Sequence, residues 1–274
     1  MAQHSLFEFL TRTEIPRIPL RAGVERTRNT RSDTYPPKSV NPVPWNNFFT
    51  YHTIMQSQYA TALGVNVTKD PVNSPPLPVS GEQSVRAQLG EYVYRRMRRA
   101  LANTPYPPSH TQMRMETGDM AYFESSNALP DFVGHMVSGN IPRLPGDIKC
   151  SWNWKSSWRN SQVQYEWQEF VAVVAQLNFQ MNNACSWYGY ILTDTELVLF
   201  CKKDNQYANH IEMALGIPLA QHDSRGAFTH ASGHLTALLA LWYIHMLVSN
   251  DHTWSVDGTK SDPEADMDSS SDFE

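Results

Sequence analysis

The feature that most constrains the fold of this 274-residue chain is the order in which its hydrophobic periods follow one another. Apolar residues recur at helical spacing over residues 80–102, give way to strand-sized runs over 120–152, and return to helical spacing over 164–181. Two more strand-sized runs follow, and residues 234–250 are apolar almost all round, as in a helix packed on several sides. Helices that alternate with strands predict one α/β domain, over residues 46–250.

Two flanking segments differ from this domain in composition. Residues 1–45 are rich in Arg, Pro, Thr and Asn over most of their length and show no sustained period, so we expect an irregular or disordered arm. Residues 251–274 are expected to form an acidic, disordered tail. The tail holds a net charge of −6 from residue 256 onward, which leaves about +1 of the total of −5 for the rest of the chain. Because the rest of the chain is nearly neutral, we expect its affinity for any DNA or RNA partner to be moderate and salt-dependent.

The cysteines and the apolar segments bear on location. Cys150, Cys185 and Cys201 form an odd set without CxxC spacing, which is typical of a reducing compartment. The N-terminus lacks the basic start and apolar run of a signal peptide, and the apolar stretch 235–248 is shorter than the ~20 residues of a membrane span. We therefore expect an intracellular protein of the nucleus or cytoplasm that does not bind membranes.

One constellation of charged residues suits metal-dependent chemistry. Asp131 follows a proline, and after 15 further residues comes the triplet Asp147-Ile148-Lys149. Residues two apart on a strand share a face, so Asp147 and Lys149 point the same way. Carboxylates suit Mg²⁺ or Mn²⁺, and a lysine beside them stabilises charge that develops on phosphorus. Spacing alone also fits the alternative of a loop aspartate and a separate surface ion pair.

The sequence motifs around these residues resemble those of a known protein family. Five segments, in their order along about residues 80–250, are similar to the fungal PD-(D/E)XK nuclease-like proteins. They are Leu129–Val133, Gly146–Trp154, Val174–Phe179, Tyr188–Val198 and Leu239–Leu247. The specific parts are Gly-Asp-Ile-Lys-x-Ser-Trp-x-Trp and Tyr-Gly-Tyr-Ile-Leu-Thr-Asp. The resemblance implies a restriction-endonuclease-like core, in which a mixed central β-sheet is flanked by helices. It also implies a metal-dependent phosphodiesterase that acts on nucleic acid.

The resemblance assigns a role to each matching residue. Asp131 and Asp147 become metal ligands, Lys149 the catalytic lysine and Gln176 the glutamine of a covering helix. A first-helix acid is also implied, and we expect it to be Glu82.

Helical position separates Glu82 from its competitor. Counted at 100° per residue from Val85, Glu82 lies within the arc of the apolar stripe, whereas Glu91 points nearly opposite. An N-terminal acid favoured by the helix dipole is an equal alternative for Glu82, and a solvent-facing position is an equal alternative for Gln176.

Two departures from the family pattern keep other functions open. Gln180 stands where related nucleases often carry tyrosine, and Cys150 stands where the fungal proteins often have proline. Neither change removes a metal ligand, but both bear on substrate positioning. The alternatives are a catalytically inactive binding or effector module with the nuclease fold, and a small-molecule biosynthetic enzyme that uses the same cleft.

Two basic or aromatic clusters are compatible with nucleic-acid contact. A mixed group could form a single-strand binding surface or, equally, pack beneath a helix; it consists of Trp152, Trp154, Lys155, Trp158 and Arg159. A second group near the end of the first helix could contact phosphates and consists of Arg95, Arg96, Arg98 and Arg99.

We predict that removal of residues 256–274 changes thermal stability little, because this acidic segment has almost no apolar surface to bury. The midpoint of thermal unfolding, compared between the full chain and the truncated chain, tests this. A large drop on truncation would show instead that the tail docks on the domain.

Overall fold

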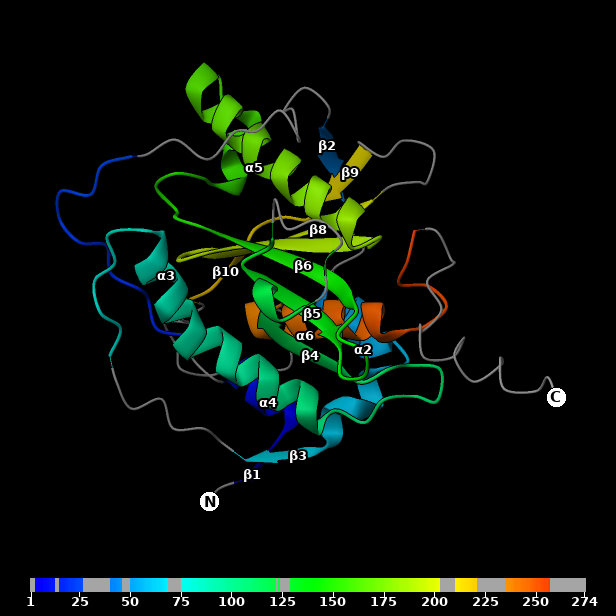
Figure 1. Ribbon diagram of the computed structural model, residues 1–274. Coiled ribbons are helices and arrows are strands. Elements are labelled where there is room, and N and C mark those ends of the chain that lie inside the picture. Colours follow the sequence, from blue (N-terminus) through cyan, green and yellow to red (C-terminus); the bar gives the residue numbers. More distant parts are fainter. Residues whose placement is uncertain are drawn as a thin grey trace.

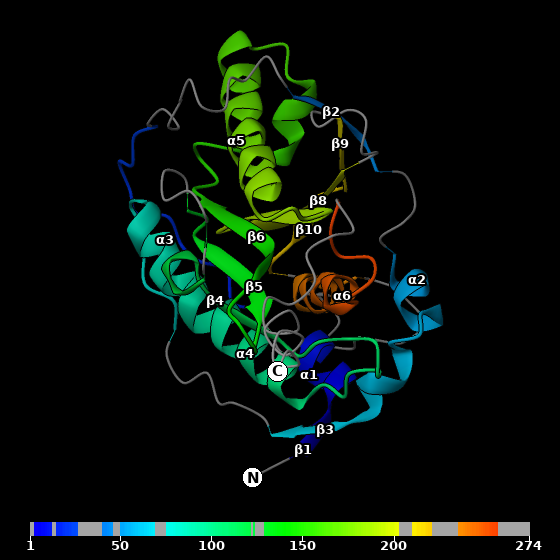
Figure 2. The same ribbon diagram turned by 45° about the vertical axis from the view of Figure 1, so that its right-hand side comes forward.

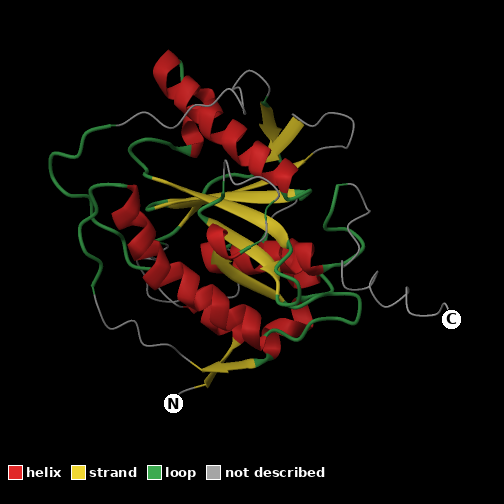
Figure 3. Ribbon diagram, in the orientation of Figure 1, coloured by secondary structure: helices red, strands yellow, loops and turns green. Residues whose placement is uncertain are grey.

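A mixed β-sheet runs through the middle of the protein, and helices cover both of its faces (Figures 1 and 3). This computed structural model describes residues 3–12, 15–26, 40–45, 50–68, 75–121, 123, 129–202, 210–220 and 235–256. The α/β class and the mixed central sheet flanked by helices are as the sequence predicted.

Eight strands form the sheet, and seven of them lie side by side. Their order is β2 (Asn41–Pro44), β9 (His210–Met213), β8 (Glu196–Lys202), β7 (Tyr188–Thr193), β6 (Pro142–Lys149), β5 (Phe132–Met136) and β4 (Met113–Thr117), with β10 (Ile217–Pro218) paired to β8. The β6–β7 and β2–β9 pairs are parallel, and the other neighbours are antiparallel. A separate antiparallel pair consists of β1 (Gln3–Ser5) and β3 (Asn66–Thr68).

The helices occupy the segments where helical periodicity predicted them, with two short additions near the N-terminus. They are α1 (Leu6–Arg12), α2 (Tyr51–Gln56), α3 (Glu82–Leu89), α4 (Arg95–Asn103), α5 (Gln164–Asn183) and α6 (Ala237–Ser249). A π turn over Gly90–Tyr94 joins α3 to α4, and 3-10 turns cover Ala60–Gly64, Gly118–Met120 and Ser156–Asn160. The short apolar run Met120–Phe123 predicts a strand by its pattern, and this prediction is wrong: Met120 ends a 3-10 turn, and the strand of this region is β4.

The two faces of the sheet have separate hydrophobic cores. On one face, α5 packs Phe170, Val174 and Leu177 against the sheet. On the other face lie α6, α1 and the α3–α4 helix, and the outermost pair β1–β3 lies beyond them (Figure 2). Helix α6 is buried along nearly its whole length, which explains why its sequence is apolar all round. The single crossover from β6 through α5 to β7 places these two strands parallel.

Helix α3 begins one residue later than its sequence motif suggests. The segment Ser80-Gly-Glu-Gln83 has the Ser-x-x-Gln form of a capping box and predicts Ser80 as the cap, but the N-cap is Gly81, and the hydroxyl of Ser84 makes the capping contacts. Ser84 Oγ accepts from the backbone N–H of Ser80 and of Gly81, at 3.0 and 3.1 Å, and donates to the Gly81 carbonyl at 2.8 Å. The hydroxyl therefore satisfies backbone groups that the first turn leaves open.

The flanking segments are more regular than the sequence predicted. Within the arm expected to be irregular, α1 buries Leu6, Phe9 and Leu10 in the core against α6 and α4. At the other end, Trp254 is 1% exposed and stacks beneath the Arg143 guanidinium at 4.7 Å. These apolar side chains have surface to bury, which composition averaged over a whole segment conceals. Residues 257–274 of the expected tail lie outside the described residues.

Across the described part of the chain, none of the helices combines the length and the apolar character needed to cross a membrane.

Two histidines are buried together between α6 and the sheet. The His245 ring lies against Gly134 of β5, where a Cβ atom would approach its Nε2 to 2.9 Å. Burial lowers the pKa of His245 to about 4 and also lowers the pKa of His135. Both side chains are therefore neutral at pH 7 in the folded protein.

We predict that stability falls as the pH drops from about 6.5 to about 4. In this window the unfolded chain binds protons that buried, neutral His245 does not, so acid favours unfolding. The loss assigned to His245 is about 3 kcal/mol and is complete below pH 4. Urea unfolding of the wild type and of His245→Gln at several pH values measures this loss. Equal slopes against pH for the two proteins would contradict it.

Candidate active site

Strand register brings Asp131 and Asp147 together. Strands β5 and β6 are antiparallel with Phe132 opposite Gly146, so Asp131, which immediately precedes β5, lies opposite Asp147. The Asp131 carboxylate reaches across the pair and accepts a hydrogen bond from the Ile148 backbone N–H at 2.7 Å. Two acids that are 16 positions apart in the sequence thus lie opposite each other on neighbouring segments of the sheet.

Lys149 completes a buried ion pair on the same strand. Its Nζ lies 2.6 Å from Asp147 Oδ2, and the two side chains are 7% and 2% exposed. Asp147 pairs in register with Ile191, which belongs to the core beneath α5, so the ion pair lies on the α5 side of the sheet. Charges this deep are tolerated because each compensates the other.

Arg86 connects α3 to this pair of strands. Its guanidinium forms an ion pair with Asp131 Oδ1 and lies 4.0 Å from Glu82 Oε1. The helical count placed Glu82 on the buried side, but its side chain is 48% exposed because it is the first residue of α3. Glu82 therefore approaches Asp131 through Arg86. Glu91 forms an exposed pair with Arg95, as its position predicted.

Two glutamines on α5 face the same region. Gln180 is buried, and its Nε2 lies 3.5 Å from the carbonyl of Leu129, two residues before Asp131. Gln176 lies one helical turn earlier on the same side of α5. Among the described residues, the side-chain oxygens of both glutamines are buried without a hydrogen-bond partner. The contact made by Gln180 was not predicted, since the sequence presented this residue only as a departure from the family pattern.

Two carboxylates hold the chain that follows Lys149. Asp194 accepts from the backbone N–H and the hydroxyl of Ser151, both at 2.7 Å. Glu196 accepts from the N–H and the hydroxyl of Ser156 at 2.8 and 2.7 Å. In the sequence, Thr193–Glu196 predicts a tight turn between two strand-sized runs, which gives these acids no supporting role. The only sequence signal for that role was the presence of two acids just after β7, the strand that lies parallel to β6.

Cys150 and Tyr190 lie beside the site, and both side chains are uncharged. Burial first, and then the charges of Glu82 and Asp194, raise the pKa of the Cys150 thiol to about 12, so it stays protonated, as expected of a buried thiol. Burial and the charge of Asp147 also raise the pKa of Tyr190, whose ring lies directly over Gly146. Only glycine leaves room for that ring.

The clusters singled out as possible nucleic-acid surfaces differ in exposure. Trp154 is fully buried and stacks on Phe170 of α5 with ring centroids 5.9 Å apart, and Trp158 is 5% exposed. These tryptophans therefore pack beneath a helix. Of the four arginines near the end of the first helix, Arg96 is buried and the other three reach the surface.

The oxygen donors at the site are of the type that a hard cation takes. Mg²⁺ takes oxygen ligands and is often held by one or two carboxylates together with water and phosphate. Asp131 and Asp147 supply such carboxylates, and the unpartnered amide oxygens of Gln176 and Gln180 lie on the helix above. Within the described ranges no group of three or more His, Cys, Asp or Glu side chains could hold a metal ion. Here Arg86 and Lys149 balance the two carboxylates.

Comparisons of this chain with protein-family models, with curated proteins and with solved structures found no match.

The buried ion pair predicts a specific pattern of stabilities. Asp147→Asn leaves the Lys149 ammonium buried without its carboxylate and should lower the free energy of unfolding by about 3–5 kcal/mol. Lys149→Met should cost a similar amount. The double variant should lose clearly less than the sum of the two, because it leaves no charge behind. Urea denaturation of the four proteins completes this cycle, and simple additivity would contradict the pairing.

Proposed function

We propose that this protein is a metal-dependent phosphodiesterase that acts on nucleic acid and has a PD-(D/E)XK-like core. The observation that carries the proposal is the register of β5 and β6, which sets Asp131 opposite Asp147, the partner of Lys149, with the Asp131 carboxylate on the Ile148 N–H between them. The central mixed sheet, the α3 side chains at its edge and the glutamines of α5 are compatible with such a core.

The residues of the site have two kinds of role: some would hold the cation, and others would stabilise the charge that develops on the substrate. Asp131 and Asp147 would hold the cation, which supplies a polarised phosphate and a more acidic bound water. Lys149 offers an ammonium that stabilises the negative charge developing on phosphorus in the transition state. Gln176 contributes an amide oxygen on the covering helix. Arg86 is 46% exposed, so its side chain has room to leave Asp131 and to contact a phosphate instead.

These roles predict that substitution of the lysine and substitution of the acids affect turnover and metal binding differently. With Mg²⁺ or Mn²⁺, Lys149→Gln should lower turnover by about 10²–10³, since one such contact is worth about 3–4 kcal/mol, and should not weaken metal binding. Asp131→Asn and Asp147→Asn should lose both metal binding and cleavage. Titration calorimetry and cleavage of single- and double-stranded DNA and RNA measure the two properties, with circular dichroism used to check that each variant is folded.

Glu91→Gln is the matched control, because it removes an acid of the same helical segment that lies outside the site. It should bind Mg²⁺ or Mn²⁺ with the affinity of the wild type and should retain cleavage. A wild type that cleaves none of these substrates, or a folded Lys149→Gln variant with full activity, would overturn the nuclease proposal.

A second candidate is a binding module with the nuclease fold and no turnover. The observation that favours it is that Arg86 and Lys149 already neutralise both carboxylates from within the protein. A fold can be retained while the chemistry of its site is lost. In the same calorimetry, this alternative gives no metal binding by the wild type.

A further inference from the structure

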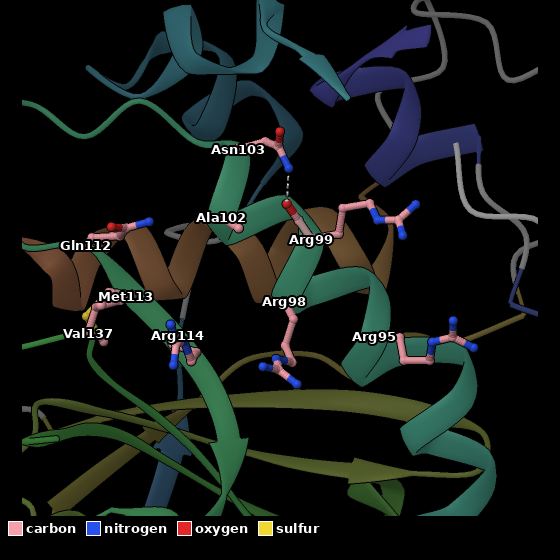
Figure 4. A pocket seen from close by; sticks show the side chains of 9 residues that line it. All are labelled: Arg95, Arg98, Arg99, Ala102, Asn103, Gln112, Met113, Arg114 and Val137. Carbon is pink, nitrogen blue, oxygen red and sulfur yellow. Dashed lines mark hydrogen bonds between the residues drawn. The ribbon is translucent and has the colours of Figure 1, made fainter. Parts of the chain in front are cut away.

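An arginine-lined groove lies between α4 and the start of the edge strand β4 (Figure 4). It is an open hollow of about 460 Å³. Its polar lining consists of Arg95, Arg98, Arg99, Asn103, Gln112 and Arg114, and no acidic side chain of the described residues lines it. Such a surface selects for anions.

The positive charge of Arg98 and Arg114 is only partly offset within the protein. Arg98 Nη2 and Arg114 Nε share one carboxylate oxygen, Glu116 Oε1, at 3.1 and 4.0 Å. Arg95 pairs with the exposed Glu91 at 3.0 Å. One carboxylate against the guanidinium groups of Arg98 and Arg114 leaves about +1 on the β4 side of the groove, although the body of the chain as a whole is nearly neutral.

The orientation of Arg98 is fixed from beneath. Glu116 is 11% exposed and accepts a hydrogen bond from the Tyr94 hydroxyl as well as pairing with Arg98. The Tyr94 ring stacks on Phe132 with centroids 5.3 Å apart, and the Arg98 guanidinium lies 5.5 Å above that ring. Because these contacts order the side chain in advance, an anion bound there incurs less of the entropic cost of ordering it.

The groove and the candidate site lie along one helical segment. Helix α3 leads through the π turn into α4 (Figure 1). Arg86 in the last turn of α3 contacts Asp131, and Arg98 follows twelve positions later on α4. At 1.5 Å per residue the separation along the helix is about 18 Å, which is the axial length of about five nucleotides of a duplex strand. A strand whose phosphate reaches Asp131 is therefore long enough to extend to the groove.

We infer that the α4–β4 groove binds the phosphate backbone of a nucleic acid at about five nucleotides from the candidate site. The inference rests on the proposed function and adds to it the surface that holds the substrate away from the reacting phosphate. Planar guanidinium groups match phosphate oxygens two at a time. Four of them spread along an open groove fit a repeating polyanion better than a single small anion.

The test measures nucleic-acid binding without cleavage. Fluorescence anisotropy with a labelled DNA strand of about 20 nucleotides, and with its duplex, is recorded in EDTA at several salt concentrations. Arg95→Gln/Arg114→Gln removes two exposed guanidinium groups and keeps Arg98 on Glu116. We expect its affinity at 0.1 M salt to fall about tenfold or more, and the slope of log K against log salt to become shallower by about 2.

The control is Arg12→Gln/Arg26→Gln, which removes the same charge from matched positions. Arg12 pairs with Glu8 four residues away, as Arg95 does with Glu91, and Arg26 lies 3.7 Å from Glu166. All four arginine side chains are about half exposed. This control should lose far less affinity and keep the salt slope of the wild type.

The outcomes separate this inference from the proposed function. If the wild type cleaves nucleic acid but the groove variant binds like the control, the groove assignment is wrong and the nuclease proposal stands. If binding depends on the groove arginines but the wild type neither binds metal nor cleaves, the groove stands and the nuclease proposal fails. Failure of the wild type to bind DNA at 50 mM salt, or binding of a poly-glutamate peptide in preference to DNA, overturns the inference.

Discussion

The burial of β6 on both faces is the constraint on which the rest of the structure depends. All eight of its residues are buried, with α5 on one side and the core of α6 and the α3–α4 helix on the other. A strand in this position cannot leave a charge to solvent, so Asp147 and Lys149 must satisfy each other. Its parallel pairing with β7 requires the α5 crossover that brings the two glutamines over the site.

The two carboxylates of the candidate site differ in how readily their counter-charges can move. Lys149 is held in the interior beside Asp147, whereas Arg86 reaches Asp131 from the surface and is about half exposed. Moving a long exposed side chain costs little beyond a weak ion pair, but moving a buried ammonium exposes an uncompensated charge. The counter-charge is therefore displaced more easily from Asp131 than from Asp147.

The π turn over Gly90–Tyr94 links the candidate site to the arginine groove. It ends at Tyr94, whose hydroxyl bonds to Glu116 of the edge strand and so fixes how α4 lies on β4. Arg86 precedes this turn, and the groove arginines Arg95 and Arg98 follow it. Turns of this kind are frequent where a helix must aim side chains at a functional site. Local charge along this segment is high although the chain overall is not strongly charged.

Local periodicity was enough for the sequence to determine α5, α6, β7 and β8, and to put Asp147 and Lys149 on one face of a strand. It missed α1, whose seven residues are helical because α6 and α4 bury them, and β4, whose alternating charges hide an edge strand. Only the tertiary structure decided that Asp131 lies opposite Asp147 and that Arg86 forms an ion pair with Asp131. It also decided that Gln180 contacts the backbone just before Asp131. Periodicity is a property of neighbouring residues, whereas register and ion pairing depend on segments that meet only when the whole core forms.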